Sequence, residues 1–520
     1  MNKSLRIGID VGGTNTDLVL LDRKNTVLLS TKITAQKGVF QGIQQALALA
    51  FNKLKEQKAN LDCICIGTTH ATNALLEGKN LLKIGVLRIG STMKKALPPA
   101  YTFPKHLQSL ICGVKTIRGG HYIDGRKIEP LVLEEAEIAI SDLIKFGAQG
   151  IAICGTFSPL YPEQENLIAQ YIQKKHPTIA ITCSHVVGGI GFLSRENSTI
   201  CNTALQKILR ETFEYLQTYI QRTYNTTCPL YFVQNNGTTI SFEEAFTNPI
   251  TTIAAGPANS LMGGSLLQQE YPNAIIVDIG GTSTDIGCIK DGHPKQSFNG
   301  NAIGGITLST TMADLISLSI GGGSVITFNK NYENILIGPD SIARALPEKA
   351  MAFGGSTLTL FDCAVKMNLI PELSEQTVSI SPMLADKVLF HTAEVIVKQL
   401  KQLQLQVPNA PIIVVGGSSF LAHYLQKLQP KEKYIIPKQG ATANAFGAAC
   451  ARISGSIDET VSLQNQETAI ERLAQKAIKK ACAAGACPKT ITIVSTEIIP
   501  YGYSTDAKAR VLITAAGTIF

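Results

Sequence analysis

Residues 10–17 read Asp-Val-Gly-Gly-Thr-Asn-Thr-Asp, and residues 278–285 read Asp-Ile-Gly-Gly-Thr-Ser-Thr-Asp. The two octapeptides are identical at six positions and differ conservatively at the other two. An apolar run precedes each octapeptide and a second apolar run follows it, which predicts two β-hairpins whose turns carry Gly-Gly-Thr. A Rossmann loop is excluded, because its glycines would lead into a helix. The chain is therefore expected to contain a duplicated unit.

The residues in these turns are suited to holding phosphate. Glycines let a ligand approach backbone N–H groups, and threonine hydroxyls add further donors. We expect the two turns to bind a polyphosphate from both sides, through Gly12, Gly13, Thr14 and Asn15 in the first and Gly280, Gly281, Thr282 and Ser283 in the second. Asp10 and Asp278, at the strand ends, are expected to hold Mg²⁺ mostly through water. The alternative, two ordinary glycine turns, does not require aspartate and threonine at matching positions.

Length and composition limit the class of protein. A chain of 520 residues predicts two or three domains, and 45% hydrophobic with 17% charged residues indicates a globular fold. The formal charge of +8 is scattered along the sequence, which argues against a nucleic-acid partner. The longest charge-free stretch, residues 245–269, contains prolines and glycines, so no membrane span is expected. The N-terminus alternates like a strand, which favours a cytoplasmic protein with reduced cysteines.

Strand and helix patterns alternate between the two octapeptides and beyond them. Helices are predicted over residues 42–55, 134–146, 163–175, 199–224 and 420–428, and strands over 63–67, 150–154, 229–234 and 411–415. Gly416 and Gly417 end the last of these strands before a helix, where a phosphate or a purine can lie against backbone. The alternative is that the two glycines serve only to let the turn pack tightly, without a ligand. The pattern predicts an α/β fold.

Six motifs in order along nearly the whole chain resemble the hydantoinase A/oxoprolinase family, in its short stand-alone branch. They are DVGGTNTD, GTTHATNALLEGK, AAGPANSLMGG, VDIGGTSTDIG, MADLISLSIGGGSVI and IGPDSIARALPEKAMAFGGSTLTLFDC. The resemblance implies duplicated ribonuclease-H-like lobes, as in actin and sugar kinases, with ATP in the cleft between them. We expect lobes over residues 1–195 and 196–455 and a small C-terminal α+β segment over 456–520, with a helix over 468–483 and strands over 490–499 and 507–514.

The resemblance also implies roles for individual residues. Asp10, Asp17, Asp278 and Asp285 are the expected catalytic carboxylates of the two phosphate loops. Gly416 and Gly417 match the adenosine turn, and Gly321 and Gly322 are expected to contact the nucleotide. The expected substrate residues are Thr68, Thr69, His70 and Asn73. Two departures from the family pattern bear on the substrate: His70 stands where an apolar residue is usual, and residues 343–347 read ARALP where small residues are usual.

The activity implied is ATP-dependent hydrolysis of a small cyclic amide, of the hydantoin, 5-oxoproline or lactam type. An amide is a poor electrophile, and phosphorylation of its carbonyl oxygen turns that oxygen into a leaving group that water can displace. A second hydantoinase-type subunit is an expected partner, and we expect a homo-oligomer. Two alternatives remain open: a small-molecule kinase of the same fold and a non-catalytic ATP-binding switch.

Two glycine-flanked histidine loops predict a second site. His121 and Asp124 lie in one loop and His185 follows a strand in another. Two histidines and a carboxylate are a common ligand set for a transition metal, and the same residues could instead bind substrate. Loop histidines that cap backbone groups are the alternative.

Overall fold

The computed structural model describes residues 4–12, 15–34, 39–91, 97–298, 301–328, 335–373, 376–501 and 508–519. Gly13 and Thr14 of the first predicted phosphate loop lie outside these ranges. Within the described ranges, no helix combines the length and the apolar character that a membrane-spanning segment requires. All twelve cysteines are free thiols in this structure.

The first octapeptide forms the predicted hairpin. Strands β1 (Ser4–Val11) and β2 (Asn15–Asp22) pair antiparallel, and Asp10 lies opposite Asp17. Strand β4 (Asn60–Thr68) runs parallel to β1, with Gly67 opposite Asp10. Apolar residues are buried on both faces of β1 and β2, as expected for strands covered by helices on both sides.

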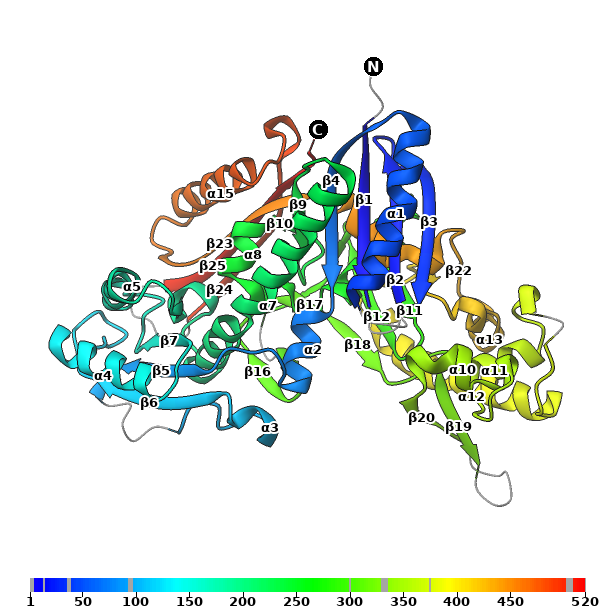
Figure 1. Cartoon of the computed structure of the whole chain (residues 1–520), viewed down its shortest axis with the longest axis horizontal. Coiled ribbons are helices and arrows are strands. Elements are labelled where there is room, and N and C mark those ends of the chain that lie inside the picture. The colour runs from blue at the N-terminus through cyan, green and yellow to red at the C-terminus, as the bar shows by residue number, and fades with distance from the viewer. Residues whose placement is uncertain are drawn as a thin grey trace.

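The second octapeptide repeats this arrangement. Strands β11 (Ala274–Ile279) and β12 (Thr284–Lys290) pair antiparallel, with Asp278 opposite Asp285. Strand β21 (Ile412–Val415) runs parallel to β11, as β4 does to β1. The two hairpins lie near each other in the middle of the molecule (Figure 1). The predicted α/β fold with duplicated lobes is confirmed, because each octapeptide has the same strand neighbours.

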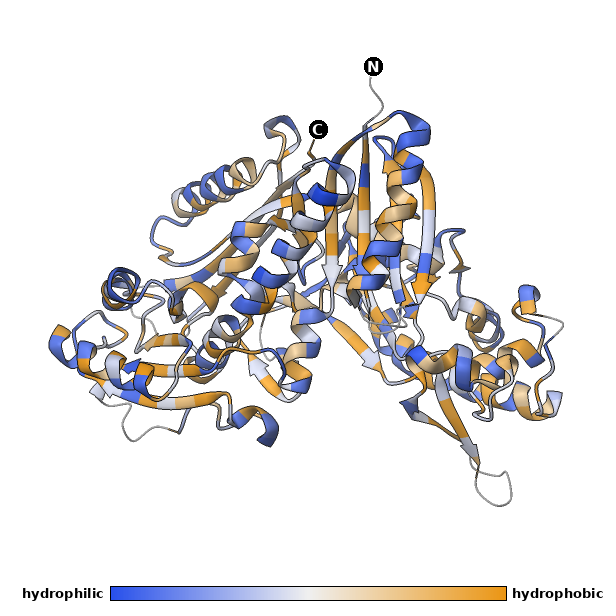
Figure 2. Cartoon of the chain, in the orientation of Figure 1, coloured by the Kyte–Doolittle hydropathy of each residue, from blue (hydrophilic) through white to orange (hydrophobic). Residues whose placement is uncertain are grey.

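Helices cover both sheets. Helix α1 (Val39–Gln57) and the long α7 (Phe192–Tyr224) contribute to the core of the first hairpin, and α12 (Pro382–Gln404) and α13 (Ala422–Leu428) to that of the second. Figure 2 shows hydrophobic residues along the central strands and many hydrophilic residues on α15 (Gln466–Ala483), which lies at the outer edge. Burial of the apolar strand residues is the main stabilising term for each lobe.

A four-stranded parallel sheet is inserted between the first hairpin and α7. Its order is β6 (Ile111–Ile117), β5 (Ile84–Ile89), β7 (Gly150–Gly155) and β8 (Ala180–Cys183). Helices α4 (Leu133–Lys145) and α5 (Glu163–Lys175) pack on this sheet and match the predicted helices closely. The insertion lies at the lower left of Figure 1.

The first sheet continues past the predicted domain boundaries. It has nine strands, and β9 (Leu230–Val233) and β10 (Thr239–Ser241) join β4 to β23 (Ile453–Ser462), β25 (Lys508–Gly517) and β24 (Thr492–Pro500). The C-terminal strands and α15 therefore extend this sheet. The division of the chain at residues 195 and 455 stays a prediction.

Two helices cross between the hairpins at very short distance. They are α9 (Ala255–Leu266) and α14 (Ala443–Cys450). A Cβ on Gly263 would lie 1.8 Å from the Ala443 carbonyl oxygen, and one on Gly447 would lie 2.1 Å from the Asn259 carbonyl oxygen. Glycine is required at both positions because backbone meets backbone there. The crossing places Asn259 and Ser260 of α9 and Asn444 of α14 next to the carboxylates of the hairpins.

Candidate active site

An open cavity of about 300 Å³ lies between the two hairpins. Both predicted phosphate loops and the predicted adenosine turn contribute to its wall, together with Lys32, Ser260, Phe361 and Asn444. Residues more than 400 positions apart in sequence, such as Gly12 and Gly417, share this one wall. The fold thus brings most of the described residues of the predicted nucleotide site to one cavity, whose wall does not include Ser283 or Gly321.

The two loops close in the same way. The Gly12 N–H donates to the Asn15 carbonyl oxygen over 3.0 Å, and the Gly280 N–H donates to the Ser283 carbonyl oxygen over 2.9 Å. Cβ atoms at Gly12 and Gly280 would lie at the same distance, 3.3 Å, from these oxygens. The sequence repeat is therefore also a repeat of backbone conformation.

Asp10 and Asp17 are held by amide groups from the crossing helices. Asn444 Nδ2 donates to Asp10 Oδ2 over 3.0 Å and to Asp17 Oδ2 over 2.8 Å. Asn259 Nδ2 donates to Asp10 Oδ1 over 3.0 Å. Lys32 Nζ, from β3 (Val27–Thr34), lies 2.6 Å from Asp17 Oδ2. Each lobe therefore contributes donors to the carboxylates of the first hairpin.

The carboxyl groups of Asp10, Asp278 and Asp285 have raised pKa values. Burial raises the pKa of Asp10 to about 6, and the negative charge of Asp17 adds to this while the two amides oppose it. Burial also raises the pKa of Asp285 to about 6, with the Ser317 hydroxyl opposing and Asp278 adding. The pKa of Asp278 is raised by burial, which a hydrogen bond from Ser260 partly offsets. Crowded, poorly solvated carboxylates of this kind are stabilised by a cation.

The donor set fits Mg²⁺. Oxygen ligands from a few carboxylates, with room for water, are what this ion prefers. Asp17 Oδ1 is buried and finds no hydrogen-bond partner among the described residues, so an acceptor remains for a metal-bound water. Asp10 and Asp278 would hold the ion, as the sequence predicts, with the cavity beside them as the expected place of the phosphates.

A third glycine run supports the second loop. The Gly322 N–H donates to the Gly280 carbonyl oxygen over 3.0 Å, and the Gly323 N–H donates to the Gly281 carbonyl oxygen over 2.7 Å. A Cβ on Gly321 would lie 2.6 Å from the Thr282 nitrogen. Gly322 and Gly323 line the cavity, whereas Gly321 is needed for the close approach of backbone to the loop.

The predicted adenosine turn packs directly on the second hairpin. Gly416 has φ of +90°, and a Cβ there would lie 2.3 Å from Asp278 Oδ1. The Ser418 N–H donates to the Ile279 carbonyl oxygen over 2.9 Å. In the first lobe the Thr69 N–H donates to the Val11 carbonyl oxygen over 3.1 Å, which makes Gly67-Thr68-Thr69 the counterpart of Gly416-Gly417-Ser418.

The predicted substrate residues lie at the start of α2 (His70–Glu77). The Thr68 hydroxyl accepts from the His70 N–H over 3.0 Å, and the Thr69 hydroxyl donates to the Val11 carbonyl oxygen over 3.0 Å. Asn73 Nδ2 donates to the Thr69 hydroxyl over 3.3 Å. These bonds fix the junction of strand and helix beside Asp10. A substrate role for the four residues stays a prediction.

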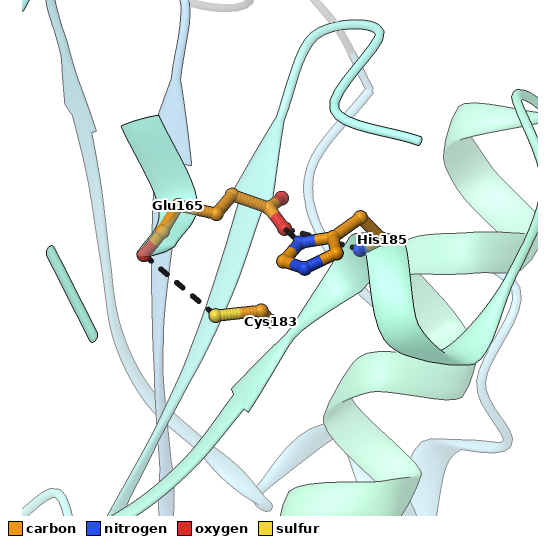
Figure 3. Close-up of side chains that lie close together, drawn as sticks. All are labelled: Glu165, Cys183 and His185. Atoms are coloured by element: carbon orange, nitrogen blue, oxygen red, sulfur yellow. Dashed lines mark hydrogen bonds and ion pairs between the residues drawn. The ribbon is translucent and has the colours of Figure 1, made fainter. Parts of the chain in front are cut away.

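The structure does not assemble the predicted site of His121, Asp124 and His185. Asp124 is engaged by Arg126, with 2.8 Å between Oδ2 and Nε, and the His121 ring packs on Tyr161 at 5.0 Å. His185 Nδ1 lies 2.6 Å from Glu165 Oε2 instead (Figure 3). Each of the three residues thus has a partner outside the predicted trio, and among the described residues the three do not gather as a group of metal ligands, which corrects the metal-site expectation.

Glu165, Cys183 and His185 are the one group of three metal-ligand side chains that meets within 4.8 Å among the described residues. Glu165 already accepts four hydrogen bonds, from the Gly155 N–H, the Ser184 hydroxyl, the His185 backbone N–H and the His185 ring Nδ1. Burial raises the pKa of the Cys183 thiol, which keeps it protonated. Buried Arg195 donates to Ser184 and to two carbonyl oxygens. This network stabilises the insertion and leaves little capacity for a metal.

Three residues that bind the carboxylates of the first hairpin were not predicted from the sequence: Lys32, Asn259 and Asn444. A signal existed for the two asparagines, because Pro-Ala-Asn (257–259) and Thr-Ala-Asn (442–444) begin helices that follow the two halves of the duplication. Both asparagines bind Asp10. Lys32 lies on β3, the strand that pairs with β2 of the first hairpin, and no such repeated motif surrounds it.

Comparison with known proteins agrees with this geometry. The sequence model of the hydantoinase/oxoprolinase N-terminal region matches residues 6–176, and that of the hydantoinase/oxoprolinase domain matches residues 195–379. The chain belongs to the hydantoinase/oxoprolinase family. As a family member it has the two-lobed fold expected of the motifs.

Two relatives and one solved structure illustrate the family. Caprolactamase subunit alpha of Pseudomonas jessenii is 26% identical over 393 residues, 71% of this chain and 55% of that protein. The acetone carboxylase beta subunit of Xanthobacter autotrophicus is 26% identical over 388 residues, 69% of this chain and 53% of that protein. The match thus spans about half the length of these relatives. The crystal structure of the ATP-dependent caprolactamase from P. jessenii superposes with a TM-score of 0.77 at 20% identity, over 98% of this chain and 87% of that one.

Proposed function

We propose that this chain binds Mg-ATP between its two hairpins and uses it to open a small cyclic amide. The observation that carries the proposal is the shared cavity, whose wall joins both Gly-Gly-Thr loops, Lys32 and the carboxylates Asp17 and Asp278. A relative is named as a subunit of a caprolactamase, which supports a cyclic amide as the substrate class.

Each group has a role in this proposal. Asp10 and Asp278 hold Mg²⁺, which neutralises charge on the phosphate oxygens when it is bound. The backbone N–H groups of the loops and Lys32 position the phosphates. Asp17 and Asp285 are the candidates for orienting a proton-bearing nucleophile. The amide carbonyl oxygen attacks the terminal phosphorus and the bond to ADP breaks. Water then adds to the activated carbon, and the C–N bond of the ring breaks as the nitrogen takes up a proton. A second water releases phosphate from the acyl phosphate that remains, which leaves the open-chain amino acid.

The substrate enters beside α2 in this proposal. Thr68, Thr69 and Asn73 use their side chains to fix the junction of strand and helix. Of the four predicted substrate residues, His70 is therefore the one left to contact the substrate. Relatives named as alpha and beta subunits support a second subunit as partner. The bond-opening step takes place with that partner bound.

An ATP-turnover screen tests the proposal. The purified chain, with and without a candidate second subunit, is incubated with hydantoins, 5-oxoproline, lactams and small hydroxy acids, and both ADP and organic products are measured. Ring-opened product with ADP is expected. Phosphorylated hydroxy acid would instead identify a kinase, and nucleotide binding without turnover in every mixture would identify a switch.

A further inference from the structure

Lys32 is a cation of the cavity wall with hydrogen-bond donors that its own chain does not use. Its Nζ lies 2.6 Å from Asp17 Oδ2, and its side chain is 35% exposed. The ammonium group has three donors, and within the described ranges Asp17 is its one hydrogen-bond partner. Two donors are therefore left for a ligand that enters the cavity.

The strand that carries Lys32 is fixed on both sides of this residue. Ser30, Lys32 and Thr34 alternate along β3, so their side chains lie on the same face of the sheet. The Ser30 and Thr442 hydroxyl oxygens are 2.7 Å apart, and Thr442 directly precedes α14. The Thr34 hydroxyl donates to Asn15 Oδ1 of the first phosphate loop over 3.2 Å. These bonds position the ammonium group before a ligand binds.

The acidic partner of Lys32 is held deeper in the protein. Asn444 Nδ2 donates to the same oxygen, Asp17 Oδ2, over 2.8 Å. The Asp17 side chain is 3% exposed, against 35% for Lys32. A ligand in the cavity therefore meets the ammonium group of this ion pair, which favours an anion.

Lys32 and the predicted adenosine turn are attached to different hairpins. Lys32 is bound to Asp17 of the first hairpin. Gly416 packs against Asp278 of the second, where a Cβ would lie 2.3 Å from Oδ1. All four residues contribute to the wall of one cavity. A nucleotide whose base end lies at the Gly416 turn thus reaches the first hairpin with the phosphate farthest from its base.

We propose that Lys32 is a specificity-determining residue that binds the terminal phosphate of ATP and makes the site prefer ATP to ADP. An ammonium group donates charge-assisted hydrogen bonds to phosphate oxygens, and ADP, one phosphate shorter, leaves this donor without an acceptor. The inference rests on the proposed function and deepens it, because loss of this contact after phosphoryl transfer favours the release of ADP.

Calorimetry with two nucleotides tests this role. The full chain is titrated with Mg-ADP and with the Mg²⁺ complex of a non-hydrolysable ATP analogue. The parent protein should bind the analogue more tightly by about 10- to 100-fold, the range for hydrogen bonds to a charged group. This comparison needs no variant.

Variants at position 32 assign the preference to the ammonium group. Lys32→Gln keeps a donor for Asp17 and loses the charge. It should abolish the preference for the ATP analogue and change the affinity for ADP by less than about twofold. Lys32→Arg keeps the charge and should retain part of the preference.

Lys115→Gln is the matched control. Lys115 also lies on a strand, its Nζ is 2.6 Å from Asp142 Oδ2, and its side chain is 31% exposed. This ion pair belongs to the insertion and not to the cavity wall. The control variant should bind both nucleotides as the parent protein does.

Three results would overturn the role of Lys32. They are equal affinity of the parent protein for the two nucleotides, a preference that survives Lys32→Gln, and equal weakening of both nucleotides by that variant. A parent protein that binds neither nucleotide would contradict the nucleotide site of the proposed function as well. The turnover screen decides the cyclic-amide chemistry separately, because preferential binding of ATP without any ring-opened product would support the role of Lys32 and contradict that function.

Discussion

At the scale of single residues, the site depends on how the carboxylate of Asp10 is held. Its side chain is 4% exposed, and both oxygens accept an amide hydrogen bond, one from Asn259 and one from Asn444. Asp10→Asn would turn an NH₂ group towards one of these donors and remove the charge that Mg²⁺ needs. We expect Mg-ATP turnover to fall about 100-fold or more, as when a positioned charge partner is removed from an active site. Steady-state kinetics and nucleotide titration measure this, and unchanged affinity and turnover would assign the duplicated loops a structural role only.

Asp285 allows a prediction about pH at the same scale. Its pKa of about 6 in the folded protein exceeds the ordinary value of 3.8, so the folded state binds this proton more tightly than the unfolded state. The contribution of this carboxyl to stability is therefore complete below pH 4 and is lost as the pH rises through 6. Asp285→Asn should raise the Tm of the nucleotide-free protein at pH 8 by about 2 °C and leave it unchanged at pH 4. Thermal melts at both values check this; a lower Tm at pH 8 would contradict it.

The affinity for Mg-ATP should depend on pH for the same reason. Asp10 is a proposed Mg²⁺ ligand, and Asp285 lies opposite the other proposed ligand, Asp278. Asp10 and Asp285 both have pKa values of about 6, and a cation binds best where the surrounding carboxylates are ionised. Between pH 7 and pH 5 the affinity should fall at least about tenfold, since each group loses most of its charge over this range. Titration calorimetry across the range measures the fall. In the Asp285→Asn variant, the affinity for Mg-ATP should depend less steeply on pH. An unchanged pH dependence would show that protonation of Asp285 does not affect Mg-ATP binding.

At the scale of elements, the crossing of α9 and α14 joins the two lobes. Gly263→Ala would place a Cβ 1.8 Å from the Ala443 carbonyl oxygen, so the helices must separate. The adjacent Gly264→Ala is the matched control, because its Cβ meets only the Ile276 side chain, at 2.9 Å. We expect Gly263→Ala to cost about 2 kcal/mol more than Gly264→Ala in the free energy of unfolding and to weaken nucleotide binding through Asn259 and Asn444. Denaturant titration of both variants provides the comparison, and equal losses would contradict it.

The insertion depends on its buried charge network. Glu165 is 1% exposed and Arg195 is fully buried, and Ser184 bonds to both. Glu165→Gln would direct an NH₂ group at groups that are themselves donors, so a loss of about 3 kcal/mol is expected. Urea unfolding measures this loss, with the exposed Glu163→Gln as the control. A loss of unfolding free energy below that of the control would contradict a structural role for Glu165 and would leave a binding role for His185 as the alternative.

At the scale of the whole molecule, a nucleotide that contacts both hairpins should favour the closed arrangement of the lobes. The cavity wall comes from both halves of the chain, so the nucleotide gains more contacts when they approach. Hydrogen exchange with a non-hydrolysable ATP analogue should show protection at residues 4–12 and 274–290 together. Small-angle scattering should show compaction in the same sample. Protection confined to one lobe would exclude closure about the nucleotide.

The sequence determined the repeated hairpins and their chemistry, because a strand, a glycine turn and a paired aspartate are local features that eight residues can encode. Gly12 and Gly280 have the predicted place in the cavity wall for that reason. The helices near Glu134 and Glu163 were also predictable, since their apolar spacing is local. The order of these and the other motifs along the chain then supported the resemblance to the family.

Only the tertiary structure decided which distant groups meet. Lys32, Asn259 and Asn444 converge on one carboxylate pair because three separate elements cross there, and no local pattern reports such a contact. Packing also decided the partner of His185. Its ring bonds to Glu165, and the predicted site with His121 and Asp124 is not assembled. Spacing along a chain fixes what a segment can form by itself, whereas packing of buried surfaces against one another fixes the neighbours of each side chain. For this protein, local sequence was enough to predict the phosphate loops, whereas only tertiary packing decided which charged and polar groups surround the carboxylates of the site.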